Sequence, residues 1–240
     1  MVNQDKSKLK QIKQKLIAQA DKKKAKILQS FFKTGKGQYA RGDVFLGITV
    51  PKIRHIAKQF SDLENNDILE LLKSKYHEQR LLALLIWVEQ FSSAEQKIKT
   101  QIYQLYIKHT KYINNWDLVD LSAPKIIGSF LFNTQRDILY KFAKSPQLWQ
   151  KRIAIVATYY FIKQNDFADT FKIARILLTD KHDLIHKAVG WMLREAGKIN
   201  LAKEEEFLGK YYKNMPRTML RYAIEKFPEE KRLKYLKSQI

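Results

Sequence analysis

Apolar and polar positions follow the 3.6-residue period of amphipathic α-helices along most of the chain, and no useful length shows the alternation of a strand. Five apolar helical patterns each open with a polar or aromatic residue, and their starts follow one another at intervals of about 35 residues. They begin at Arg80, Trp116, Arg152, Lys187 and Arg221. Further helical patterns lie between them, over residues 98–108, 136–143 and 167–178.

A period of this length, filled by two helices, is typical of a helical solenoid, in which each pair of helices buries its apolar faces against its neighbours. The repeats agree in spacing and apolar pattern but hardly in identity, so a globular helix bundle is the alternative. We predict an all-α fold in which residues 1–240 form a single domain, a right-handed stack of helix pairs with a curved inner face.

The segment 1–36 is rich in Lys, and its apolar residues recur at helical spacing. It therefore predicts two basic amphipathic helices rather than a disordered tail. Residues 33–38 break the pattern, and Gly42 and Gly47 keep the chain irregular to about residue 50. Thr49 followed by Pro51 then indicates the start of a helix.

The charge of the chain points to a polyanionic partner. It carries 45 Lys and Arg against 24 Asp and Glu, a formal charge of +21. Nucleic acid and an anionic membrane surface are the two candidates. The longest apolar run, residues 81–88, is far short of a membrane span, and no signal peptide is visible, so we favour nucleic acid and a cytoplasmic protein. If the curved inner face carries the surplus cations, it offers a groove of about duplex width whose affinity depends strongly on salt.

The segment 114–120 holds the most pointed arrangement of candidate residues. Trp116 and Asp120 are four apart and share one face of the predicted helix. Asp117 lies three before Asp120, so both carboxylates could be reached from one side. A carboxylate beside an aromatic wall suits a reaction whose transition state is positively charged. The alternative is structural, with Trp116 in the core and the aspartates capping the helix or pairing with Lys.

Two residues of the later repeats could join this pair. Arg152 opens its repeat at the same phase as Trp116 and could clamp a phosphate, or it could form a salt bridge between repeats. Trp191 could supply a second aromatic wall, or it could pack against a neighbouring helix with Gly190 giving room. Trp87, within an apolar run, is expected to lie in the core.

Other chemistry finds little support in the sequence. With no Cys, the chain has no disulfide and no Cys-ligated metal centre. His182 and His186 are spaced to share a metal ion, but neither the zincin motif nor a third ligand accompanies them. No dinucleotide fingerprint, P-loop or nucleophile elbow is present. We therefore expect neither a metal nor a cofactor.

Several ordered motifs resemble the AlkD-type DNA alkylation repair glycosylases. They are Trp-Asp-Leu-Val-Asp at 116–120, Lys-Arg-Ile-Ala around residue 152, and Lys-Ala-Val-Gly-Trp-Met-Leu-Arg at 187–194. Phe-Leu-Gly-Ile-Thr-Val-Pro-Lys-Ile-Arg at 45–54 and Met-Pro-Arg-Thr-Met-Leu-Arg-Tyr-Ala at 215–223 add to the likeness. The resemblance runs from about residue 30 to residue 235.

The resemblance implies a superhelix of HEAT-like repeats that wraps duplex DNA and hydrolyses the N-glycosidic bond of cationic N3- and N7-alkylated purines, as a monomer. It places the essential carboxylate at Asp120, flanking aromatic rings at Trp116 and Trp191, and a contact near the lesion backbone at Arg152. It also implies capture of the lesion without base flipping. The alternative function is a non-catalytic HEAT-repeat module that recognises DNA structure or damage.

Overall fold

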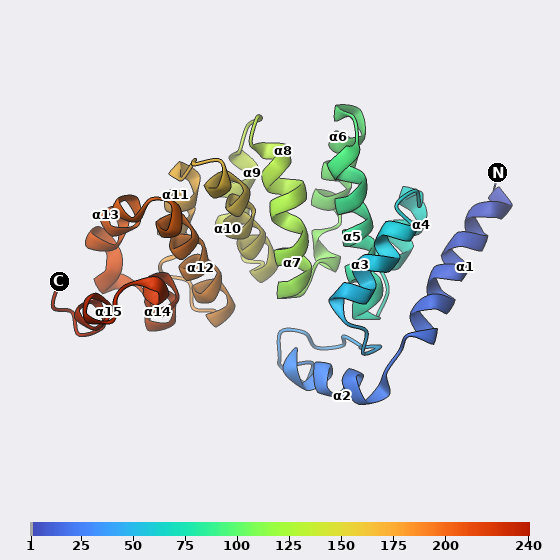
Figure 1. Cartoon of the computed structure of the whole chain (residues 1–240), viewed down its shortest axis with the longest axis horizontal. Helices are drawn as coiled ribbons and strands as arrows, with labels where there is room; N and C mark the ends of the chain where they lie inside the picture. The colour runs from blue at the N-terminus through green and yellow to red at the C-terminus, as the bar shows by residue number, and fades with distance from the viewer. Residues whose placement is uncertain (1) are drawn as a thin grey trace. The chain divides into compact units, whose positions relative to one another are not determined.

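The computed structural model describes the backbone of residues 2–240 and the side chains from residue 8 onward. Over these residues the secondary structure consists of α-helices and short 3₁₀ or π turns, and the only β pairing is one isolated bridge between Val44 and Tyr76 (Figure 1). The all-α prediction is confirmed. None of the described helices is both long enough and apolar enough to cross a membrane.

The chain divides into two compact units, residues 1–122 and 123–240. The single-domain arrangement over 1–240 and its right-handed superhelix stay predictions. The first unit, blue to green in Figure 1, contains α1 (Val2–Ala18), α2 (Lys22–Phe31), α3 (Val50–Gln59), α4 (Asn65–Leu72), α5 (His77–Ser93), α6 (Gln96–Lys108), η1 (Thr110–Tyr112) and most of α7 (Trp116–Ala123).

The core of the first unit forms around α5. This helix is apolar on nearly all sides, so it is buried by its neighbours rather than presenting one stripe, and α3 and α4 both pack against it. Trp87 is fully buried there, as expected, and its indole Nε1 donates to Asn65 Oδ1 at 2.9 Å. The predicted start of α3 is also confirmed, with Thr49 at the N-cap and Pro51 in the first turn.

The two Lys-rich helices α1 and α2 differ in how they bury their apolar residues. The stripe of α1 is buried, and Lys13 pairs with Glu70 of α4 at 2.5 Å. Its buried residues are Leu9, Ile12 and Leu16. In contrast α2 buries none of its residues, and Ile27 and Phe31 are 67% and 62% exposed, so its predicted apolar face is largely open to solvent.

The second unit arranges its longer helices in two layers. It contains η2 (Pro124–Gly128), α8 (Ser129–Leu131), α9 (Asp137–Ala143), α10 (Leu148–Lys163), α11 (Ala168–Leu177), α12 (Asp183–Ile199), α13 (Leu201–Tyr211), η3 (Tyr212–Asn214), α14 (Arg217–Ala223), η4 (Ile224–Lys226) and α15 (Glu229–Leu236). Helices α10, α12 and α14 pack side by side in one layer, while α9, α11 and α13 form the other (Figure 1).

The last three repeat starts predicted from the sequence fall in α10, α12 and α14, so within this unit they mark one layer. This is the arrangement that a period filled by two helices predicts, because every second helix occupies the equivalent position.

Small residues set the distance between neighbouring helices of that layer. A Cβ atom on Gly190 of α12 would overlap the carbonyl oxygen of Met219 and the Cβ of Tyr222, both on α14. Gly128 makes the corresponding close approach to Ala157 and Tyr160 of α10. Gly190 therefore gives room to the backbone of α14 and not to the neighbouring Trp191.

We predict that Gly190→Ala lowers the free energy of unfolding by about 1–3 kcal/mol, because the added methyl group forces α12 and α14 apart. Urea denaturation measures the change. Gly209→Ala on α13 is the control, since a Cβ there meets no atom within 4 Å and Ala favours the helix. Equal stability of Gly190→Ala and the wild-type protein would contradict the close approach.

Candidate functional site

Helix α7 begins with the residues that the sequence singled out. The buried Asn115 accepts a hydrogen bond from the backbone N–H of Trp116 at 2.8 Å through its Oδ1 atom, which stabilises the first turn. Asp117 does the same for Leu118 at 2.9 Å. The start of α7 is therefore fixed by two side chains, and the ring of Trp116 projects from a rigid turn.

Trp116 is half-buried and belongs to a ladder of aromatic rings. Its indole stacks on Phe32, with 5.1 Å between centroids and 10° between planes, and Phe31 meets it edge-on at 6.2 Å. Phe32 stacks in turn on Phe45 at 4.9 Å, and Phe45 on His77 at 4.5 Å. Trp116 is partly buried and packs against the hydrophobic cluster that contains Phe32 and Phe45, so it is neither fully enclosed nor freely exposed.

Asp120 lies one turn further along α7 and is partly exposed. The fully buried Tyr106 lies near it, and its hydroxyl is 2.9 Å from Ser122 Oγ, which donates to the Leu118 carbonyl at 2.5 Å. Burial raises the pKa of Tyr106 far above its usual value, and the negative charge of Asp120 adds to the effect. A neutral phenol therefore lies near the carboxylate.

A buried cluster of charged and polar side chains contacts the start of α7 on its interior side. His77 Nε2 donates to Asp117 Oδ2 at 2.7 Å, and its Nδ1 lies 3.5 Å from Asp43 Oδ2. Arg80 pairs with the same Asp43 oxygen at 2.7 Å, and Asn115 Nδ2 donates to it at 3.2 Å. All five residues are buried. Asp117 is thus part of the interior and does not share an accessible side with Asp120.

The cluster keeps His77 positively charged. Burial alone would lower the pKa of His77, but the carboxylates of Asp117 and Asp43 outweigh it and raise the pKa from its usual 6.5 to about 9. For the acid Asp43 burial has the opposite effect and would raise the pKa, but the positive charges of His77 and Arg80 hold this pKa below its usual value. An imidazolium between two carboxylates therefore connects α5 to α7 and to the loop at Asp43.

Glu78 fastens the loop that carries Phe45. Its carboxylate accepts hydrogen bonds from the backbone N–H groups of Leu46, Gly47 and Ile48 at 2.9, 2.8 and 3.2 Å. Gly47 has a φ of +84°, and a Cβ on it would overlap the carbonyl of Asp21 at the start of α2. The aromatic ladder beneath Trp116 therefore rests on a loop that α5 holds in place.

The residues of this buried cluster, and the role of Glu78 in holding the loop, were not predicted from the sequence. The visible signal was a run of four polar residues, His-Glu-Gln-Arg at 77–80, directly before a long apolar run. Polar groups at the start of a buried helix need partners, so the run indicated buried pairing. It did not indicate which distant residues supply the partners.

Arg152 and Trp191 lie in the second unit, on adjacent helices. Arg152 is buried, and its Nη1 donates to the carbonyl of Leu184 in the first turn of α12 at 2.5 Å, so it links α10 to α12. Trp191 is partly exposed on α12, and its ring lies 5.9 Å from that of Tyr159 on α10. Lys163 places its Nζ 5.2 Å from the Tyr159 ring, which adds positive charge to this aromatic surface.

The structure places Trp116 and Asp120 one turn apart on α7 of the first unit, and Arg152 and Trp191 on the adjacent helices α10 and α12 of the second. The contact of Arg152 with Leu184 and that of Trp191 with Tyr159 lie two turns apart along these helices. That all four gather at one site stays a prediction.

His182 and His186 have structural partners. His182 Nδ1 accepts from the backbone N–H of Leu184 and caps α12, and His186 Nε2 contacts the carbonyl of Asp180 at 2.5 Å. Where side chains are described, no group of three His, Asp or Glu residues could hold a metal ion.

Comparisons with known proteins agree with this fold. Residues 12–227 match the family model described as DNA alkylation repair enzyme, and the chain belongs to that family. A solved structure, a predicted DNA alkylation repair enzyme from Enterococcus faecalis, is similar with a TM-score of 0.69 at 18% identity, covering 88% of this chain and 98% of that one. A search of curated protein sequences found no match. The family indicates a role in the repair of alkylation damage, with DNA as the partner.

We predict that the charged cluster makes stability depend on pH. The folded protein holds the His77 proton more tightly than the unfolded chain, so its contribution is complete below about pH 6.5 and disappears as the pH rises through about 9. The free energy of unfolding of the wild-type protein should exceed that of His77→Gln by up to about 3 kcal/mol at low pH, and the difference should shrink across this window.

Chemical denaturation of both proteins from about pH 6 to about pH 10 measures this difference, and subtracting the variant removes the titration of all other groups. His55→Gln is the control, because the exposed His55 lies outside the cluster. A difference that stays constant over the whole range would show that His77 is not held as a cation.

Proposed function

We propose that this protein is a DNA glycosylase that hydrolyses the N-glycosidic bond of cationic N3- and N7-alkylated purines in duplex DNA. The observation that carries the proposal is the pair on α7, a partly exposed carboxylate at Asp120 one turn from the half-buried indole of Trp116. The buried cluster around His77 fixes this helix, so the pair is held in place before any substrate arrives.

The chemistry needs few groups from the protein. Alkylation at N3 or N7 places a positive charge on the purine, and the base leaves as a neutral molecule when the bond from C1′ breaks. The sugar becomes oxocarbenium-like, water adds its oxygen to C1′, and one proton is released. Asp120 stabilises the developing cation and orients or accepts a proton from the water. Because the leaving group is already activated, no general acid is required.

The aromatic rings and the arginine take supporting roles in the proposal. Trp116 and Trp191 pack on the sugar, exclude stray water, and favour the cationic transition state through their electron-rich faces. Arg152 lies near the phosphate backbone of the lesion. The proposal takes residues 1–240 as one domain.

We further propose that the protein acts as a cytoplasmic monomer, without a cofactor and without base flipping. The net charge of +21 supports binding to the phosphate backbone. The protein would then select its substrate by how readily the alkylated base leaves the sugar, and not by how well the base fits a pocket.

Asp120→Asn should lower the rate of release of 7-methylguanine and 3-methyladenine from methylated duplex DNA by about 100-fold or more, because the amide no longer stabilises the cation. Chromatography of the released bases measures the rate, and filter binding at two salt concentrations measures affinity. The variant should keep its affinity, and both proteins should bind more weakly at the higher salt.

Asp137→Asn is the matched control, since Asp137 is an exposed acid in the first turn of α9. It should release bases at the wild-type rate. Unchanged release by Asp120→Asn would remove Asp120 from the reaction. Tight, salt-sensitive binding without any base release by the wild-type protein would instead assign the non-catalytic DNA-binding function.

A further inference from the structure

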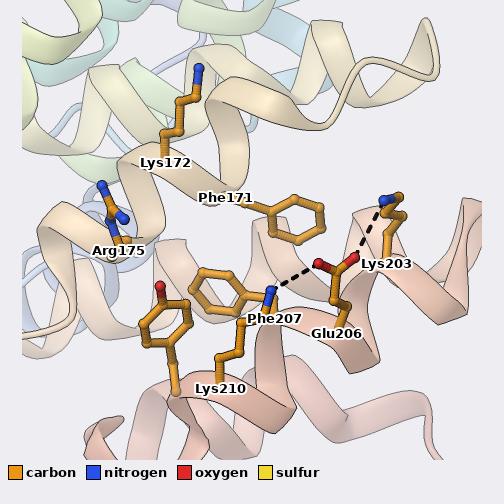
Figure 2. Close-up of a pocket in the computed structure, with 8 residues that line it drawn as sticks. Phe171, Lys172, Arg175, Lys203, Glu206, Phe207 and Lys210 are labelled. Carbon is orange, nitrogen blue, oxygen red and sulfur yellow. Dashed lines mark hydrogen bonds and ion pairs between the residues drawn. The ribbon is translucent and has the colours of Figure 1, made fainter.

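A cavity of about 240 Å³ opens between α11 and α13 in the second unit (Figure 2). The proposed reaction does not use it. Its lining combines aromatic rings with basic side chains. The lining residues are Phe171, Lys172, Arg175, Lys203, Glu206, Phe207, Lys210 and Tyr211.

Three aromatic rings form the floor of the cavity. Phe171 of α11 and Phe207 of α13 stack with 5.4 Å between centroids and 22° between planes, and Figure 2 shows the two rings next to each other between the two helices. Tyr211 continues the surface, with its ring 4.8 Å from that of Phe207. Phe207 is buried, whereas Phe171 and Tyr211 are partly exposed, so the aromatic surface open to a planar ligand comes from these two residues.

The rim of the cavity is strongly basic. Glu206 is its one acidic residue, and it pairs with Lys203 at 3.3 Å and with Lys210 at 3.0 Å. Lys172 and Arg175 are exposed on α11, and neither has an acidic partner among the side chains that the structure describes. Four cations against one carboxylate leave a surplus of positive charge that attracts an anion.

The cavity lies in a different layer of the unit from Trp191. The Trp191 ring contacts Tyr159 on α10, in the layer of α10, α12 and α14, whereas the cavity is built on α11 and α13 of the other layer. It is therefore separate from the surface to which we assign the lesion.

We propose that this cavity binds a nucleotide, with the base on the partly exposed rings of Phe171 and Tyr211 and the phosphate at Lys172 and Arg175. The volume is below that of pockets for drug-sized ligands and suits a single base better than a base pair. The combination of stacking rings with cations at their edge is the one by which proteins hold unpaired nucleotides.

Two sources can supply this ligand, a free nucleotide or an unpaired nucleotide of a strand. Equilibrium dialysis distinguishes them, with 2′-deoxyadenosine 5′-monophosphate and a 5′-phosphorylated deoxyadenosine tetramer as probes. If a strand is the source, the tetramer binds at least about tenfold more tightly than the mononucleotide and competes with it. If the free nucleotide is the source, the tetramer binds no more tightly. Either result supports the site.

The variants test the residues of the rim in the full-length protein. The double variant Lys172→Gln, Arg175→Gln should weaken binding of the mononucleotide by about tenfold, because the phosphate loses its cationic partners. Glu206→Gln should tighten binding by about threefold or more, because it removes the one negative charge and releases two lysines.

Lys213→Gln and Glu230→Gln are the matched controls. Lys213 is an exposed lysine that does not line the cavity, and Glu230 pairs with Lys234 one turn away on α15 as Glu206 pairs with Lys210 on α13. Both should leave the affinity within about twofold of the wild type, which separates a local effect from one of net charge.

The proposal is overturned if neither probe binds, if the double variant binds as the wild-type protein does, or if inorganic phosphate alone binds as tightly as the mononucleotide. It is also overturned if an acidic peptide binds more tightly than either probe. Because the assays measure binding and not base release, they stand or fall independently of the glycosylase assignment.

Discussion

The imidazolium of His77, held between Asp43 and Asp117 in the interior, is the interaction on which the first unit depends. It joins three segments that are distant in the sequence, namely the loop at residue 43, the start of α5 and the start of α7. A buried charge of this kind is tolerated only when every partner is present. The same partners thereby fix the first turn of α7, and with it the direction in which Trp116 and Asp120 project.

In the second unit, small residues allow some of the helices to approach one another closely. Gly128 and Gly190 each face a backbone carbonyl of the next helix and the tyrosine three residues after it, and the second set follows the first at a constant interval along the chain. These close approaches bring η2 against α10 and α12 against α14. Helices α11 and α13 shape a second surface of their own, on which aromatic and basic residues gather.

The helices and their order could be predicted from the sequence, because the apolar period records which face of each helix is buried. The start of α3 at Thr49 and the burial of Trp87 follow from the same local rules. The exposure of Ile27 and Phe31 could not be predicted, because the apolar pattern of a helix does not show whether another part of the chain packs on it.

The candidate site was predictable only in part. The i, i+4 spacing placed Trp116 and Asp120 on one face of α7, and the resemblance to a known family supplied their roles. The same spacing rule suggested that Asp117 shares an accessible side with Asp120, which is wrong because His77 draws Asp117 into the interior. Pairing between distant polar residues depends on the tertiary fold, and one sequence carries no direct record of it.

The separation of these partners along the chain also bears on the order of events during synthesis. Asn115 and Asp43 are 72 residues apart, and Glu78 meets the loop at residues 46–48 about 30 residues after that loop is made. A chain leaving the ribosome therefore carries an open loop until α5 and then α7 have emerged. Until then the loop at residues 43–48 lacks the side chains that hold it in the folded protein, so the N-terminal segment reaches its final structure only after α7 has been made.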